Sequence, residues 1–314
     1  ALTREGAAWN MGWTRALNAR IALSVPQLTL AGEKLSQASL PLTNGNGLIR
    51  LDGAAARWQG GDALLTGALE QTEKSALAVD EEPGPAPLSG SLDLNVKDAI
   101  LPGWLSGASP GVKGGRFDLT LKGTGAGPTP RAILAVLTGD GTASARGGGI
   151  TGLDMALVSR RLAEGGPKGP TQLRAALRAN GETGFDTLSL SFILADQAAA
   201  LSGIDATGPQ GRIGGAGRWS WKNRTLDLSL TVSPASPAGA PALGIKLAGP
   251  EKAAVRTLDL AAADAWLSKR ETERLARQAE AVEAASQAAK AKGRQAPPAP
   301  PPPAQKAPAK PETK

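Results

Sequence analysis

The sequence predicts a mainly β protein: a curved antiparallel multi-stranded sheet (groove or sandwich) with a few short helices, a C-terminal α-helix and a disordered tail. Three observations support this prediction. Apolar and polar residues alternate with a period of two in most segments up to residue 250. Glycine-rich turns separate those segments. After residue 259, glycine and proline give way to alanine, glutamate and arginine, which favour a helix.

Residues 1–87 are predicted to form a block of short strands that continues a larger β region upstream. Ile21, Leu23 and Val25 alternate with Ala22 and Ser24. Further short strands are expected at 40–42, 48–51, 54–58 and 63–69. The Asn-Gly-Asn-Gly sequence at 44–47 is the strongest turn signal, and tight turns favour an antiparallel meander because parallel strands need crossover helices. The acidic, proline-rich segment 71–87 is expected to be an exposed loop.

Residues 88–258 are predicted to form a second β module. A strand at 92–96 precedes a short helical or turn segment at 98–105, and a strand at 117–121 precedes a glycine-rich turn at 123–127. Thr129 and Pro130 suit the cap and first position of a short helix, with Ile133, Leu134 and Leu137 on its apolar side.

The module continues with a strand that breaks at the three glycines 147–149 and leads to helices at 155–163 and 172–178. Five strands then follow, at 188–194, 199–206, 211–221, 226–232 and 243–247. Residues 222–224 are predicted to be the turn of a hairpin. Trp219 and Trp221 lie on one face of their strand and are interpreted as an anchor rather than a rim.

Residues 259–292 are predicted to form the C-terminal helix. Leu260, Leu267, Leu275 and Val282 give it a thin apolar seam, and Trp266 is the expected docking residue. Glu273 and Arg277, four residues apart, suit an ion pair on its exposed face. Residues 293–314 are rich in alanine, proline and lysine and cannot build a core, so a disordered or extended tail is expected.

The composition argues against an enzyme. The 314 residues include neither histidine nor cysteine, which removes the commonest general base, the commonest zinc ligand and nucleophile–histidine catalysis. The glycine-rich segment 123–127 before a helix resembles a phosphate-binding loop, but no Gly-Lys-Ser/Thr follows. Asp118, Asp140, Asp154 and Asp227 fit solvated strand faces and turns. We therefore expect no catalytic, cofactor-binding or metal-binding residues, and no cofactor.

The net charge of +7 is concentrated in the tail, because residues 289–314 carry six basic residues and one acidic residue. No aromatic residues lie between these basic residues to stack on bases, so we expect a solvated basic tail and no nucleic-acid partner. No segment reaches the roughly 18 apolar residues of a membrane-spanning helix. Since the sequence begins within a strand-like pattern, we expect a piece of a longer protein whose membrane anchor lies upstream.

Several short motifs follow one another in a fixed order between residues 114 and 267. They are the Lys122-Gly123 strand exit, the Thr-Pro-led helix at 129–137, Leu137–Thr142, Gly149–Asp154, Thr187–Phe192, Gly215–Gly217, Leu226–Leu228, Ala248–Pro250 and Leu258–Leu260. In this order, over about half of the chain, they resemble the C-terminal region of the AsmA-like family of bacterial envelope proteins. The basic, proline-rich tail is not part of that family pattern.

The resemblance implies a non-enzymatic periplasmic protein of a Gram-negative bacterium, anchored to the inner membrane by a segment upstream of this chain. It implies a role in outer-membrane assembly and in phospholipid transport between the inner and outer membranes. Some relatives form β-sheet grooves that shelter acyl chains. The partners would be phospholipid or another membrane lipid and other envelope proteins. The oligomeric state is not indicated.

Two packing arrangements remain open for the apolar strand faces. The residues alone favour a closed sandwich, since sheets normally bury their apolar face internally. The resemblance favours an open trough lined by apolar residues, because exposed apolar area of this size usually binds something. The candidate lipid-facing residues are Leu188, Leu190, Phe192, Leu194, Leu226, Leu228, Leu230 and Val232. A function from a different class is an adaptor that binds another envelope component through the C-terminal helix and the basic tail.

Overall fold

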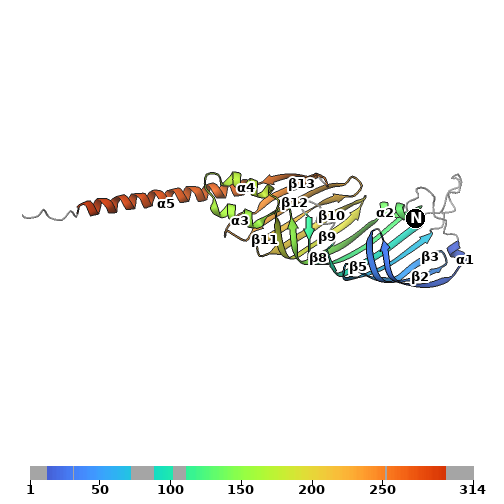
Figure 1. The fold of residues 1–314 in the computed structure, drawn as a ribbon. Helices are drawn as coiled ribbons and strands as arrows, with labels where there is room; N and C mark the ends of the chain where they lie inside the picture. Colours follow the sequence, from blue (N-terminus) through green and yellow to red (C-terminus); the bar gives the residue numbers. More distant parts are fainter. Residues whose placement is uncertain (1–12, 31, 72–87, 102–110, 252, 295–314) are drawn as a thin grey trace, which may run out of the picture. The chain divides into compact units, whose positions relative to one another are not determined.

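The computed structural model describes residues 13–30, 32–71, 88–101, 111–251 and 253–294. Fourteen strands form one sheet, and each neighbouring pair is antiparallel (Figure 1). The sheet is open and curved, which confirms the mainly β prediction and replaces the sandwich alternative by a single sheet. The predicted loop 71–87, apart from Gln71, lies outside the described residues, as do 102–105 and the tail from 295.

The N-terminal part is a meander, as predicted. It begins with the short helix α1 (Trp13–Ala16). The strands are β1 (Ala19–Leu30), β2 (Glu33–Gly45), β3 (Leu48–Trp58), β4 (Gly61–Gln71) and β5 (Leu88–Ile100). Asn46 and Gly47 both have positive φ angles, +53° and +83°, as a tight hairpin turn requires. Because β4 pairs directly with β5, the sheet runs without interruption from the first block into the second.

The second part follows the same meander, interrupted by helices. Its strands are β6 (Gly111–Lys113), β7 (Arg116–Gly127), β8 (Thr138–Thr151), β9 (Glu182–Ala195), β10 (Ala198–Gly208), β11 (Gly211–Ser220), β12 (Thr225–Pro234), β13 (Leu243–Pro250) and β14 (Val255–Asp259). Its helices are α2 (Pro130–Ala135), α3 (Met155–Glu164), α4 (Gly169–Arg178) and α5 (Ala261–Arg294). The predicted helices 155–163 and 172–178 and the hairpin turn at 222–224 are confirmed.

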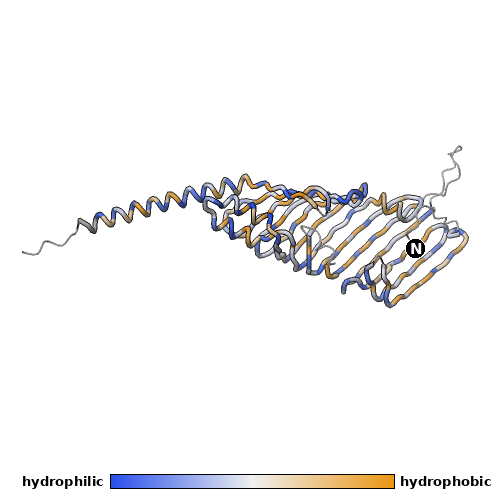
Figure 2. The backbone as a smooth tube through the Cα atoms, turned by 45° about the horizontal axis from the view of Figure 1, so that its top comes forward, coloured by the Kyte–Doolittle hydropathy of each residue, from blue (hydrophilic) through white to orange (hydrophobic). Residues whose placement is uncertain are grey.

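Alternation along the strands divides the sheet into two faces (Figure 2). We call the face that carries Leu65 the inner face and the opposite face the outer face. The register aligns Leu65 with Leu94, Leu94 with Leu121, Leu121 with Gly141 and Gly141 with Phe192, so apolar or small residues form a continuous row on the inner face. Side chains on neighbouring strands in register lie on the same face, which is why the row persists.

Successive connections in the meander lie at opposite ends of the strands. One end, which we call the α2 rim, carries α1, the β2–β3 turn, α2, and the β9–β10, β11–β12 and β13–β14 turns. The other end, which we call the α3 rim, carries the β1–β2 and β3–β4 turns, α3, α4 and the start of α5. Thr14 of α1 is fully buried, and its carbonyl oxygen accepts a hydrogen bond from the Gly47 N–H, which fixes α1 to the α2 rim.

Glycines change the predicted strand boundaries in two places. The expected strands 48–51 and 54–58 are one strand, β3, with a register shift between Leu51 and Ala54 around Gly53, whose φ is +86°. The expected break at 147–149 is also wrong, because β8 continues through it; Gly147 (φ +60°) and Gly148 (φ +155°) absorb the irregularity. Glycine tolerates these φ values without steric cost, so the chain bends and pairing continues.

The predicted glycine-rich turn at 123–127 is wrong, since these residues complete β7. A methyl group on Gly125 would lie 2.7 Å from the carbonyl oxygen of Ile133, and one on Gly127 would lie 2.8 Å from the Ala132 side chain. Helix α2 therefore packs directly on this end of β7, and only glycine leaves room for it. Thr129 caps α2 as predicted, accepting a hydrogen bond from the Ala132 N–H at 3.1 Å.

Helices α3 and α4 and the first turns of α5 build the main core. Met155, Val158 and Leu162 of α3 and Leu173 of α4 are fully buried. They pack with inner-face residues of β12 and β13 and with Leu267 of α5. The chain divides into two compact units, 1–267 and 268–314. Trp266 packs against the core of the first unit, as predicted.

Helix α5 corrects the predicted seam. Leu260 lies before the helix, which begins at Ala261, and β14 occupies the residues just before it, a strand that the sequence analysis did not predict. Leu260 and Leu267 are buried, whereas Leu275 and Val282 are exposed. The ion pair on the exposed face joins Arg274 to Glu271 at 2.7 Å. No helix in the described ranges is long and apolar enough to cross a membrane.

Candidate functional site

All eight candidate lipid-facing residues lie on the inner face, in two columns on β9 and β12. The register across β10 and β11 connects these columns. Leu188 aligns with Ala206, Ile213 and Val232 in one row. The next rows connect Phe192 to Leu228 through Leu201 and Gly217, and Leu194 to Leu226 through Ala199 and Trp219. The structure therefore brings the two predicted columns together as one apolar floor.

Seven of the eight candidate residues on this floor are half-buried, and Val232, nearest the α3 rim, is fully buried. The main core extends along the floor, since Leu188 and the three leucines of β12 pack against it. Helices α3 and α4 contribute to this core, in which Val232 is buried. Val232 is thus a core residue rather than a surface that a ligand could reach.

Glycines opposite large side chains make the floor smooth. A methyl group on Gly141 would lie 2.4 Å from the Phe192 ring, and one on Gly217 would lie 2.4 Å from the Leu228 side chain. Phe192 and Leu228 therefore lie flat over the neighbouring backbone instead of standing away from the sheet.

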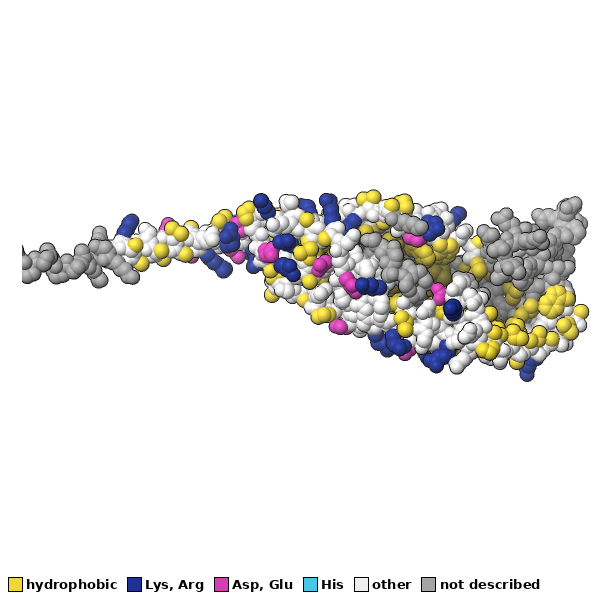
Figure 3. Space-filling model, in the orientation of Figure 1, with side chains coloured by type: hydrophobic (Ala, Val, Ile, Leu, Met, Phe, Trp, Pro, Cys, Tyr) yellow, Lys and Arg dark blue, Asp and Glu magenta, His cyan; other side chains and the backbone are white. Residues whose placement is uncertain are grey.

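The inner face of β1–β5 continues this floor, and sequence reasoning did not include it among the candidate residues. Most of its large apolar side chains are half-buried or exposed, whereas Leu88 and Val96 are buried. Ile21 and Leu23 are 52% and 50% exposed, and the half-buried ones are Val25, Leu28, Leu40, Leu42, Ile49, Leu51, Leu65, Leu69, Leu92 and Leu94. The space-filling view shows hydrophobic side chains gathered over the N-terminal strands and inside a hollow of the molecule (Figure 3). The available sequence signal was the pair Leu40 and Leu42, which are two residues apart and therefore lie on the same face of a strand.

Helix α2 is the described element that packs over this N-terminal part of the floor. Ile133 and Leu88 form a small buried cluster, against which Ile49 and Leu69 pack. Leu134, predicted to lie on the apolar inward side, is 57% exposed and points away from it. The six residues of α2 cover only one end of the strands, so the described residues leave the floor between the rims open.

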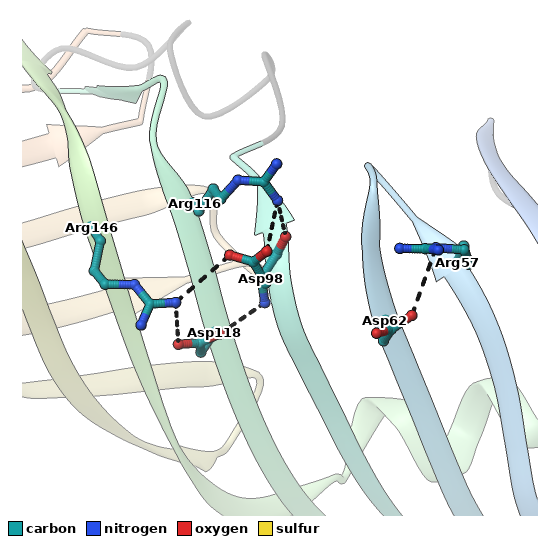
Figure 4. Close-up of polar contacts among 6 residues, drawn as sticks. All are labelled: Arg57, Asp62, Asp98, Arg116, Asp118 and Arg146. Atoms are coloured by element: carbon teal, nitrogen blue, oxygen red, sulfur yellow. Dashed lines mark hydrogen bonds and ion pairs between the residues drawn. The ribbon is translucent and has the colours of Figure 1, made fainter.

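The outer face is polar and is tied together by cross-strand ion pairs. Asp98 lies in an irregularity of β5 (φ +53°), where a helical or turn segment was predicted, and its N–H donates to Asp118 Oδ1 at 2.8 Å. Arg116 donates to Asp98 Oδ2 at 2.8 Å, and Arg146 Nη2 lies 3.5 Å from Asp118 Oδ2 (Figure 4). Asp118 therefore has a structural role in joining three strands.

Asp154 and Asp227, which were also singled out by sequence, have structural partners too. Asp154 caps α3, accepting a hydrogen bond from the Leu157 N–H at 2.8 Å. Further outer-face pairs are Arg57–Asp62 at 3.7 Å (Figure 4), Lys122–Asp93, Arg212–Asp205 and Lys246–Asp227. Exposed pairs of this kind contribute little stability each. Because these ion pairs all lie on the outer face, this face is suited to contact with solvent.

Arg256 is a charged side chain that enters the inner face. It projects from β14 and donates hydrogen bonds to the carbonyl oxygens of Leu177, at the end of α4, and of Gly152, the latter at 2.8 Å. Burial lowers the pKa of Arg256. Its two acceptors are neutral carbonyl groups, and that of Leu177 lies in the last turn of α4, where carbonyl groups lack partners within the helix. Arg256 therefore holds α4 against the sheet.

The chemistry of the inner face is that of an apolar surface. Among the residues that the structure describes, no group of three Asp or Glu side chains is placed to hold a metal ion. The floor offers aliphatic and aromatic side chains, which interact with hydrocarbon through burial and dispersion.

No family model, no curated protein and no solved structure matches this chain.

Proposed function

We propose that this chain binds phospholipid or another membrane lipid by its acyl chains on the inner face. The observation that carries the proposal is the continuous apolar floor over β1–β5, whose leucines, apart from the buried Leu88, are half-buried or exposed. Soluble proteins rarely leave a contiguous apolar surface of this kind without a ligand or partner. An acyl chain fits it chemically, because it offers only hydrocarbon and needs no hydrogen-bonding groups.

The proposal extends to the role that the AsmA-like resemblance implies. The chain would be the C-terminal part of a periplasmic protein of a Gram-negative bacterium, anchored in the inner membrane by an upstream segment. It would contribute to outer-membrane assembly by carrying phospholipid between the inner and outer membranes, without catalysis. What supports this role is the open, one-faced β sheet together with the order of motifs from Lys122-Gly123 to Leu258–Leu260.

A matched pair of neighbours on β4 tests lipid binding. Leu65 lies on the inner face and is half-buried, whereas Leu64 lies on the outer face and is 48% exposed. Protein purified from bacterial envelopes under mild conditions is expected to retain lipid in native mass spectrometry and to bind a fluorescent fatty acid in solution. Leu65→Asp should lose both signals, and Leu64→Asp should keep both. Circular dichroism checks that each variant is folded.

Two results would contradict lipid binding. One is a stable wild-type protein that neither retains lipid nor binds the fatty acid. The other is equal binding by the two variants, which would show that the inner face is not the binding surface.

A second function, an adaptor, is supported by α5. From Ser268 to Lys290 every residue of this helix is exposed except Glu271, which is half-buried. A helix of this length normally gains its stability by packing an apolar face, so α5 offers a surface for another envelope component. Removal of residues 293–314, and separately of 268–314, tests the adaptor. Loss of partner capture with unchanged lipid retention would favour it, and unchanged capture would exclude it.

A further inference from the structure

Exposed large apolar side chains are concentrated along the α2 rim. Six of them lie there: Trp13, Leu17, Leu134, Val136, Trp219 and Val255. Among the described residues at the α3 rim, the corresponding set contains Ile100 alone. The two rims are made by the same meander and differ in what their connections expose. The α2 rim is therefore the apolar edge of the floor.

Helix α2 shows most clearly that the described residues leave part of this rim uncovered. Ile133 and Leu137 face the sheet and are buried, whereas Leu134 and Val136, at 57% and 51% exposure, face the opposite way. The cap by Thr129 and the close packing of Ile133 on Gly125 fix the orientation of α2. Within the part of the chain that the structure describes, its outward side is left uncovered, and exposed apolar side chains grouped in this way usually mark a contact surface.

Trp219 adds an amphipathic side chain at the same rim. Its ring lies on the inner face, 38% exposed, with its centroid 5.9 Å from that of Trp221. Its Nε1–H donates to Glu251 Oε2 at 3.4 Å, and Arg224 also reaches Glu251 at 3.4 Å. An indole with an apolar body and a polar end held by charged turn residues suits the boundary between hydrocarbon and water.

We propose that the α2 rim docks on the surface of a phospholipid bilayer. The six side chains come from four separate places along the strand ends: α1, α2, the end of β11 and the start of β14. A protein partner requires a compact, well-packed centre, whereas a bilayer surface accepts a line of protruding residues. The rim also borders the open floor, so an acyl chain could pass from the bilayer to the floor without crossing water. This inference rests on the proposed lipid binding.

Vesicle co-sedimentation tests the docking. The probes are phosphatidylcholine vesicles and phosphatidylethanolamine–phosphatidylglycerol vesicles, and the full chain is compared with the double variant Leu134→Ser/Val136→Ser. The control is Leu64→Ser, which removes an equally exposed leucine from the middle of the outer face. Wild type and control should bind both kinds of vesicle. The rim variant should bind at least about tenfold more weakly, because two apolar side chains no longer enter the bilayer.

The outcomes separate docking from lipid binding. If the rim variant still binds the soluble fluorescent fatty acid but loses vesicles, both proposals hold. Docking is overturned if the rim variant and wild type bind vesicles equally, or if binding requires anionic lipid and disappears in high salt. Neither result contradicts the proposed lipid binding by the floor. Loss of fatty-acid binding by wild type overturns the proposed function itself. Vesicle-independent pairing through Leu134 and Val136, seen as a dimer that the rim variant abolishes, would also overturn docking.

Discussion

The two halves of the inner face share one sequence pattern but have different surroundings. From β9 to β13, Val232, Leu243 and Leu247 are buried in the core that α3, α4 and the first turns of α5 help to build, and the other inner-face leucines are half-buried. From β1 to β5 the same alternation leaves most large apolar side chains half-buried or exposed, and only Leu88 and Val96 among them are buried in the described residues. Alternation therefore reports which face of a strand is apolar. What covers that face depends on the connections, which are helices between β8 and β9 and tight turns between β1 and β4.

The largest expected effect compares a leucine from each half. Leu173 of α4 is fully buried, so Leu173→Ala should lower the free energy of unfolding by about 3 kcal/mol through lost burial and a cavity. Leu42 on β2 is only half-buried, so Leu42→Ala should lower the free energy of unfolding by less than about 1 kcal/mol. Urea denaturation of lipid-free protein measures both. Equal losses would mean that the N-terminal half is covered as well.

The next effect concerns Arg256, which holds α4 against the sheet. Arg256→Met removes the donor to two carbonyl groups and should destabilise the protein by about 2 kcal/mol. Fatty-acid binding on the open half should be unchanged, which serves as the internal control. If Arg256→Met were as stable as wild type, the attachment of α4 would have to depend on packing alone.

The helix caps sharpen the comparison further. Asp154→Ala removes the cap of α3 in the closed half and should lower global stability by about 1 kcal/mol. Thr129→Ala removes the cap of α2, which covers only the rim of the open half. We expect it to raise amide hydrogen exchange in α2 while the urea midpoint changes little. A global loss from Thr129→Ala equal to that from Asp154→Ala would contradict the distinction.

The smallest effect lies in α5, outside both halves. The hydrogen bond from Arg274 holds the pKa of Glu271 below its ordinary value of 4.5. A lowered pKa means that the carboxylate stabilises the helix at neutral pH and that this contribution disappears as the pH falls through the pKa of the folded state. Arg274→Gln should return the pKa of Glu271 toward its ordinary value in an NMR titration. An unchanged titration would show that the pair does not form in solution.

Much of the sheet could be predicted because its signal is local. Three local signals are the hairpin turn at Asn46 and Gly47, the cap at Thr129, and leucines at every second position of β12. Each depends only on residues that are close in the sequence. β14 was missed because it is only five residues long, although its partner β13 is the preceding strand and a short turn joins them. A strand of this length has too few alternating residues to be distinguished from the start of the helix that follows.

The candidate site shows the same division. The face on which Leu190 and Phe192 lie follows from periodicity alone. The full burial of Val232 does not, because it requires α3 to pack on β12. A turn was predicted at Gly125 because glycine is common in turns. In the structure Gly125 lies in β7, where the absence of a side chain leaves space for α2. The sequence also did not indicate that the inner face of β1–β5 is open. An open face and a covered face have the same alternation and differ only in the elements that pack on them.

The two edges of the sheet give it a direction. β14 is a short edge that leads into α5, whereas β1 is twelve residues long and pairs with β2 along one side. Ile21 and Leu23 project from β1 with no further strand beside them in the described residues. A main-chain edge of this kind is a template for another strand. Each strand joined there would lengthen the apolar floor by about 4.8 Å. The number of strands therefore sets the distance over which the sheet can cover hydrocarbon.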